Sequence, residues 1–199
     1  MKKIIAIVAA FAIVGFNGFM LMEASVMKAQ VIRGWEVILE VTDELAYTCP
    51  ADQTQLDFTT IAGMTGGTRE IDTSCTIETN NDDGWEVRIY ADNAGKMVDG
   101  TNEIEAYPTT TPATWVFPDS SKSYYGYYAS SSKAASDFGT TALYRNLIAT
   151  PGTLVAEDSD ETDSDGIIID FGFKVEIGTT RNQPSGEYSS FVTTTTSLK

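Results

Sequence analysis

Two-residue alternation of apolar and polar side chains recurs in several separate stretches of this chain. Between residues 70 and 79, Ile71, Cys75 and Ile77 share one phase, while charged and hydroxyl side chains occupy the other. A period of two places one set on a buried face and the other in water, as in a half-buried β-strand. The same alternation fills 35–41, 85–90 and 170–177. The pattern therefore predicts an all-β fold.

Turn-forming residues separate these stretches, and several short strands with turns between them predict an antiparallel, immunoglobulin-like β-sandwich. The one window without this alternation is Ser130–Leu147, where we expect a short helix around Ala134–Phe138. The turn signals are Gly66-Gly67, Asn80 to Gly84, Asp92 to Gly95, Asp99-Gly100, Asp165-Gly166 and Pro184-Ser185-Gly186.

The first residues have the pattern of an export signal. Lys2 and Lys3 precede an unbroken apolar run over 4–14, which is the arrangement of a signal peptide. We expect cleavage after Ala29, which leaves residues 30–199 as one domain. An uncleaved anchor is the alternative, because 4–22 is 19 residues long and a membrane-spanning helix needs about 20. Contact with a membrane is expected only through that segment.

Charge argues against a nucleic-acid partner. The chain has 13 Lys and Arg against 28 Asp and Glu, a net charge of −15, whereas a phosphate-backbone binder needs a basic face. Removal of residues 1–29 leaves 10 basic and 27 acidic residues, a net charge of −17. The chain has no His, which excludes Ser-His-Asp and Cys-His catalysis.

Two cysteines, Cys49 and Cys75, are 26 positions apart. An even number of cysteines behind an export signal favours a disulfide, because the exported chain meets an oxidising compartment. Cys49 follows one expected strand and Cys75 lies inside another, so the bond would join neighbouring strands. Two unpaired buried thiols are the alternative.

Two segments carry a resemblance to a known family. The C-terminal part has a strand over 166–177, then Gln183-Pro184-Ser185-Gly186-Glu187-Tyr188, then a closing Thr/Val-rich strand, and 75–87 holds a hairpin with Asn-Asn and Gly-Trp at its turn. These resemble WxL-type and related fimbrial-like bacterial cell-surface sandwich domains. The Trp-x-Leu signature is absent, and 115–117 is only a loose echo. The resemblance implies an extracellular or cell-surface sandwich and no catalytic residue.

An acidic run covers 157–166. Ca²⁺ binds six to eight oxygen atoms, and alternating Asp and Ser residues in a loop supply such ligands. The spacing does not follow the EF-hand template, so a solvated loop is the favoured interpretation and Ca²⁺ the alternative. The candidate ligands are Asp158, Asp160, Asp163 and Asp165; no other cofactor is expected.

Aromatic residues gather between 115 and 138. Exposed rings stack on sugars or form protein interfaces, while rings that alternate along a strand pack on one side into a core. Core packing is the first interpretation, a protein interface the second and a glycan site the third. The residues concerned are Trp115, Phe117, Tyr124, Tyr125, Tyr127, Tyr128 and Phe138.

The function expected from these features is that of a structural or adhesive surface protein without catalytic activity. A ligand-binding module for glycans or with Ca²⁺ is the alternative, and a carboxylate hydrolase is the least supported class. The closing segment Tyr188–Ser197 carries neither Lys nor Pro, so it lacks the residues that usually block strand addition. We expect association with other surface proteins or with a second copy through sheet edges, with Val31–Val41 as a donor strand. Pairing of the two terminal strands inside one monomer is the alternative.

Overall fold

The computed structural model describes residues 39, 41–50 and 56–199. Residues Val41–Lys199 form one compact unit, which contains every described strand and the described core. A unit with its own core is able to fold alone. The expected signal segment, its alternative anchor over 4–22 and most of 31–41 lie outside the described residues.

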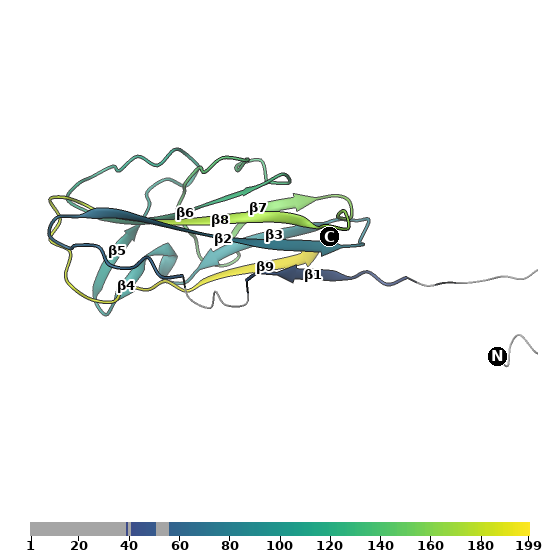
Figure 1. Cartoon of the computed structure of the whole chain (residues 1–199), viewed down its shortest axis with the longest axis horizontal. Helices are drawn as coiled ribbons and strands as arrows, with labels where there is room; N and C mark the ends of the chain where they lie inside the picture. Colours follow the sequence, from purple (N-terminus) through teal and green to yellow (C-terminus); the bar gives the residue numbers. More distant parts are fainter. Residues whose placement is uncertain (1–38, 40, 51–55) are drawn as a thin grey trace, which may run out of the picture. The chain divides into compact units, whose positions relative to one another are not determined.

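The larger sheet has six strands. It contains β1 (Leu45–Thr48), β2 (Gly67–Thr79), β8 (Ile167–Ile177), β6 (Ser123–Ser131), β5 (Asn102–Ala106) and β4 (Met97–Asp99), in that spatial order (Figure 1). The long strands β2 and β8 pair antiparallel over eleven registered positions, from Gly67 opposite Ile177 to Ile77 opposite Ile167. One pair, β5 with β6, is parallel.

The smaller sheet has three strands, β7 (Thr153–Asp158), β3 (Trp85–Ala91) and β9 (Val192–Leu198), with β3 in the centre. Both of its pairings are antiparallel. A short 3-10 turn, η1 (Asn93–Gly95), follows β3.

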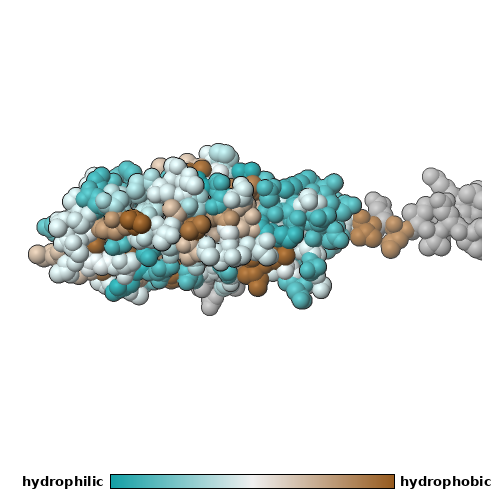
Figure 2. All heavy atoms as spheres, turned by 90° about the horizontal axis from the view of Figure 1, so that it is seen from above, coloured by the Kyte–Doolittle hydropathy of each residue, from teal (hydrophilic) through white to brown (hydrophobic). Residues whose placement is uncertain are grey.

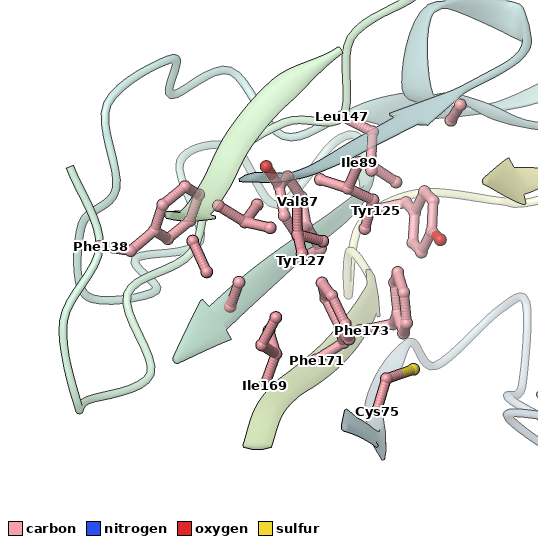
Figure 3. Packing of buried hydrophobic residues seen from close by; sticks show 14 of the residues in the cluster. Cys75, Val87, Ile89, Tyr125, Tyr127, Phe138, Leu147, Ile169, Phe171 and Phe173 are labelled. Atoms are coloured by element: carbon pink, nitrogen blue, oxygen red, sulfur yellow. The ribbon is translucent and has the colours of Figure 1, made fainter. Parts of the chain in front are cut away.

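The hydrophobic core lies between the two sheets. Side chains of β6 and β8 meet those of β3 in Figure 3, where Tyr127, Phe171 and Val87 are all close to fully buried. These residues come from alternate positions along each strand, because successive side chains of a strand point to opposite faces. The predicted all-β sandwich is confirmed.

The alternation predicted β2, β3 and β8 correctly, and the closing segment contains β9. Of the stretch 35–41, only Leu39 and Val41 are described, and both are exposed and outside any strand.

The expected helix around Ala134–Phe138 was wrong. The chain there runs along the outer edge of β7, where the Ala135 amide donates to the Val155 carbonyl (3.0 Å) and the Glu157 amide donates to the Lys133 carbonyl (3.0 Å). Pairing with the neighbouring strand satisfies these backbone groups, so the segment does not need intrahelical bonds.

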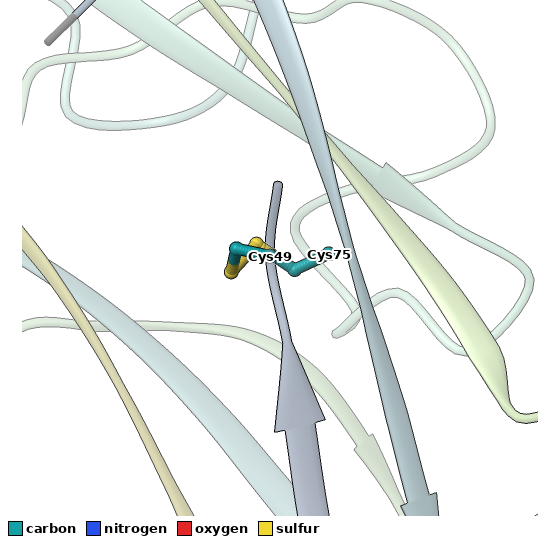
Figure 4. The surroundings of a disulfide bond; sticks show 2 residues. All are labelled: Cys49 and Cys75. Carbon is teal, nitrogen blue, oxygen red and sulfur yellow. A yellow bond between two sulfur atoms is a disulfide. The ribbon is translucent and has the colours of Figure 1, made fainter. Parts of the chain in front are cut away.

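The predicted disulfide is present. Cys49 follows β1 directly and Cys75 lies in β2, with their Cα atoms 4.3 Å apart (Figure 4). The two residues continue the β1–β2 register, in which Thr48 lies opposite Thr76.

Candidate functional site

The four tyrosines of β6 alternate between the two faces of the larger sheet. Tyr125 and Tyr127 point into the sandwich core, whereas Tyr124 and Tyr128 belong to the outer face. Burial raises the pKa of Tyr127 to about 12, because the phenolate form would lose its hydration. None of these four side chains is broadly exposed.

On the outer face, Trp115 is the centre of an aromatic cluster, and Lys174 of the same chain lies against two of its rings. The Nζ atom of Lys174 lies 5.4 Å from the centre of the Trp115 ring and 5.2 Å from that of Tyr144. The ammonium group also pairs with Glu70 (3.4 Å). A cation over a ring face is held by the ring quadrupole, so these two ring faces are occupied from within. The cluster consists of Tyr107, Trp115, Phe117, Tyr124, Tyr128 and Tyr144.

Hydrogen bonds fix the same cluster. The Trp115 indole donates to Glu176 Oε2 (2.7 Å) while its ring stacks on Tyr107 with centroids 4.2 Å apart. The Tyr128 hydroxyl donates to Asp72 (3.0 Å), and burial together with that carboxylate raises the pKa of Tyr128 to about 12. The aromatic candidates of this cluster are therefore packed and hydrogen-bonded within the chain.

The acidic candidates are spread over a strand and a loop. Asp158 is the last residue of β7 and pairs with Lys133, which together with the Ser159 amide holds the pKa of Asp158 below its usual range. Asp160, Asp163 and Asp165 follow in the loop that leads to β8. Across residues 41–50 and 56–199, no three His, Cys, Asp or Glu side chains are arranged to hold a metal ion. Among the described residues, the structure thus gives no arrangement of carboxylates that supports the Ca²⁺ alternative.

A long groove of about 1220 Å³ opens along one side of the sandwich. The apolar side chains at its base come from β6 and β8 and are already buried in the core, each 7% exposed or less: Tyr125, Phe171, Phe173, Val175 and Ile177. The groove lies where the edge of the smaller sheet, β9, faces the inner surface of the larger sheet.

Two loop segments form the walls of this groove. One wall is 56–64, whose Leu56, Phe58 and Ile61 pack against the core, and the Phe58 ring meets Tyr125 edge-on at 6.2 Å. The other wall is 182–191, which leads into β9. Large apolar side chains project from both rims, since Met64 and Phe191 are 79% and 72% exposed. In Figure 2, hydrophobic residues also form separate patches on a surface that is otherwise mostly hydrophilic.

Gln183 joins the two walls to the larger sheet. Its backbone amide donates to the Gly63 carbonyl (3.0 Å). Its side-chain NH₂ donates to the Glu103 carbonyl (3.2 Å) and to the Tyr188 hydroxyl (2.8 Å). Its Oε1 atom accepts from the Ser123 hydroxyl (2.9 Å). Tyr188 in turn donates to the Pro184 carbonyl (2.9 Å). The Gln-Pro-x-Gly-x-Tyr motif, noted in the sequence for its resemblance, thus forms a buried polar anchor beside the groove.

The outer edges of β9 and β1 differ from the other two sheet edges, because among the described residues neither strand has a strand partner on its outer side. The edge of β7 is covered by 133–135, and β4 is bridged by Ser189. β1 lies beside β9 but is hydrogen-bonded to β2. Among the described strands, β9 pairs only with β3, which leaves the backbone groups of its other edge without a strand partner. β9 carries no charged side chain.

Comparison with profiles of known protein families gives no match, and a search of curated proteins gives none either. Two solved structures are similar in fold. One is from a chaperone–tip adhesin complex of CFA/I fimbriae biogenesis, with 9% identity, a TM-score of 0.46, and coverage of 78% of this chain and 42% of that chain. The other is from a chaperone–usher pilus, with 10% identity, a TM-score of 0.40, and coverage of 88% and 99%. This chain spans less than half of the first.

Within the described part of the chain, no helix is long and apolar enough to cross a membrane.

Proposed function

We propose that this protein is a non-catalytic, extracellular or cell-surface subunit that joins other subunits by strand addition at β9. The observation that carries the proposal is the combination of an unpaired strand edge with an apolar groove at its side. Unpaired N–H and C=O groups of an edge strand template another strand, and pockets beside the edge accept alternate side chains.

The proposed occupant is the segment Val31–Val41 of a second copy. Its sequence alternates, with Trp35, Val37 and Leu39 in one phase, so a strand made from it presents one apolar face. The exposed apolar side chains on the groove rims, Met64 and Phe191, would make the first contacts with such a face. Leu39 and Val41 are exposed, which supports a segment that is free to pair with another copy.

A second copy fits better than the chain's own segment. Asn80 fixes the start of the described unit, because its side chain donates to the Thr42 carbonyl (3.0 Å) and accepts from the Glu44 amide (2.6 Å). Thr42 thus lies near the Thr79 end of β2, while the groove extends to Gly63 and Ile177 at the Gly67 end, about 40 Å of strand away at 3.3 Å per residue.

A segment that turned back from Thr42 would spend residues on the turn and fill only the near part of the groove. The segment of a neighbouring copy extends through its whole length. Contacts of this head-to-tail kind use two different surfaces on each subunit, so they produce open chains or rings rather than two-fold symmetric dimers.

Charge sets the conditions for such assembly. The expected mature chain carries a net charge of −17, so like subunits repel at low ionic strength. We expect assembly to strengthen as salt screens this repulsion.

The test is light scattering of the exported chain across salt concentrations, with two variants that place a carboxylate on an exposed apolar residue. Phe191→Asp changes the groove rim, and Ile168→Asp is the matched control on β8 away from the groove, where Ile168 is 57% exposed. We expect salt-dependent assembly in the parent and the control, and at least tenfold weaker assembly in Phe191→Asp. A strict monomer at every salt concentration, with 31–41 protected from hydrogen exchange, would show internal pairing instead and refute the proposal.

A further inference from the structure

Two arginines differ from the other cationic side chains of the described residues, because no described carboxylate forms an ion pair with Arg69 or Arg181. Each of the other described cations has such a pair: Arg88, Lys96, Lys122, Lys133, Arg145, Lys174 and Lys199. Arg69 donates to the backbone carbonyls of Thr68 (2.9 Å) and Thr60 (3.2 Å), and Arg181 donates to Gln183 Oε1 (3.4 Å). These partners are uncharged, so both guanidinium charges are available to carboxylates of another molecule.

Both arginines lie at one end of the larger sheet. β2 and β8 run antiparallel along this sheet (Figure 1), and Gly67 at the start of β2 is opposite Ile177 at the end of β8. Arg69 is the third residue of β2, and Arg181 is the fourth residue after β8. The groove reaches the same end, because Gln183 belongs to its lining. We call the surface that carries Arg69 and Arg181 the arginine end.

The opposite end of the larger sheet is acidic. The loop after β7 lies against the end of β2 there, because the Thr162 amide donates to the Thr79 carbonyl (3.0 Å). Four carboxylate residues line one hollow of about 630 Å³ at this end: Glu44, Glu78, Glu161 and Asp163. None of the four forms an ion pair with a Lys or Arg of the described chain. We call these four residues the acidic end.

The segment that we propose as the donor strand leaves the subunit at its acidic end. Asn80, directly after β2, donates to the Thr42 carbonyl (3.0 Å), and Val41 precedes Thr42. The groove of the acceptor copy extends to Gly63 and Gln183 beside the arginine end. A donor strand that enters the groove from this side brings the acidic end of its own copy to the arginine end of the acceptor.

We propose that the arginine end is the docking surface for the acidic end of a second copy, so that each junction of the assembly joins opposite charges. This inference rests on the proposed function and adds which ends meet. Ion pairs at a contact act over short distances, whereas repulsion between net charges of −17 acts over longer distances and is screened beyond about 10 Å at 0.1 M salt. Complementary charge therefore selects the orientation of the two copies, while salt still promotes their assembly.

Charge reversal separates this contact from the effect of net charge. Glu161→Lys/Asp163→Lys reverses two exposed residues of the acidic end and changes the expected mature net charge from −17 to −13, because each replacement adds two positive charges. Repulsion between net charges alone predicts stronger assembly of this variant, whereas loss of the docking contact predicts weaker assembly. Arg69→Glu/Arg181→Glu reverses the arginine end. The quadruple variant exchanges the signs of both ends and keeps the net charge of −17.

The assay is sedimentation velocity of the exported chain at about 0.15 M salt, with near-UV circular dichroism to verify that each variant keeps its fold. We expect each double variant to assemble at least about tenfold more weakly than the parent, and the quadruple variant to recover to within about threefold of it. Unchanged or stronger assembly of Glu161→Lys/Asp163→Lys, or no recovery in the quadruple variant, overturns this inference and leaves the proposed function in place as long as Phe191→Asp weakens assembly. A parent that stays monomeric at every salt concentration overturns the proposed function and this inference with it.

Discussion

Replacement of Gln183 by Leu tests the role of the buried polar anchor. The residue is 4% exposed, and its side chain makes hydrogen bonds with Ser123, Glu103, Tyr188 and, at 3.4 Å, with Nε of Arg181. Leu has a similar size but offers no polar atoms, so all of these bonds are lost. Tyr188 keeps its bond to the Pro184 carbonyl, whereas the buried Ser123 hydroxyl loses the Gln183 oxygen.

The expected cost follows from these partners. A net loss of about 1 kcal/mol for each bond, with a further penalty for a buried group left unsatisfied, is partly offset by the added apolar burial of Leu. We expect the free energy of unfolding to fall by about 2–4 kcal/mol.

Urea denaturation followed by tryptophan fluorescence measures this change. With a slope of about 2 kcal/mol per M, the midpoint should fall by roughly 1–2 M without a change in slope. Asn182→Leu is the matched control, because it makes the same type of change at the exposed neighbouring position and should stay within about 0.5 kcal/mol of the parent. Equal midpoints for the two variants would refute the argument that Gln183 anchors the walls.

Three further predictions concern the core, the aromatic cluster and acid stability. Phe171→Ala should lower the free energy of unfolding by about 3–5 kcal/mol, because the ring is 1% exposed between the sheets. A loss below about 1 kcal/mol in differential scanning calorimetry would contradict this prediction. Trp115→Phe should cost about 1–2 kcal/mol, because the hydrogen bond to Glu176 is lost, and Trp115→Phe/Glu176→Gln should cost little more in urea unfolding; additive losses would contradict this coupling. Because Lys133 lowers the folded-state pKa of Asp158, the stability from this pair is complete above pH 3.8 and is lost as the pH falls further. Lys133→Ala should therefore be less stable than the parent at pH 6, and this difference in thermal unfolding should shrink as the pH falls below 3.8; a difference that stays constant on acidification would contradict the assignment.

Local sequence patterns identified several strands because each pattern depends only on neighbouring residues. The phase of Ile71, Cys75 and Ile77 gave both the strand β2 and the face that it buries. The tyrosines of β6 show the limit of the same reasoning. Their alternation around Gly126 pointed to packing on one face, but the covering of Tyr124 and Tyr128 on the other face needs the loop that carries Trp115 and Tyr107.

Backbone pairing between segments far apart in the sequence changed two other predictions. The segment Ala134–Phe138 has residues that suit a helix, yet the unpaired edge of β7 supplies its backbone partners. The acidic run was expected to be a loop, but Asp158 ends β7 opposite Trp85, so the strand extends into the run.

The sequence by itself determined the all-β class and the disulfide, because strand periodicity and cysteine number are properties of the chain. It also identified the closing segment as lacking the residues that block an edge. Only the tertiary structure decided that β2 pairs with β8, almost a hundred residues away, and that Lys174 fills the ring faces of Trp115 and Tyr144. It alone placed the open edge of β9 beside an apolar groove. These features arise from which surfaces meet when the two sheets pack, and a one-dimensional pattern of polarity does not specify partners that are distant along the chain.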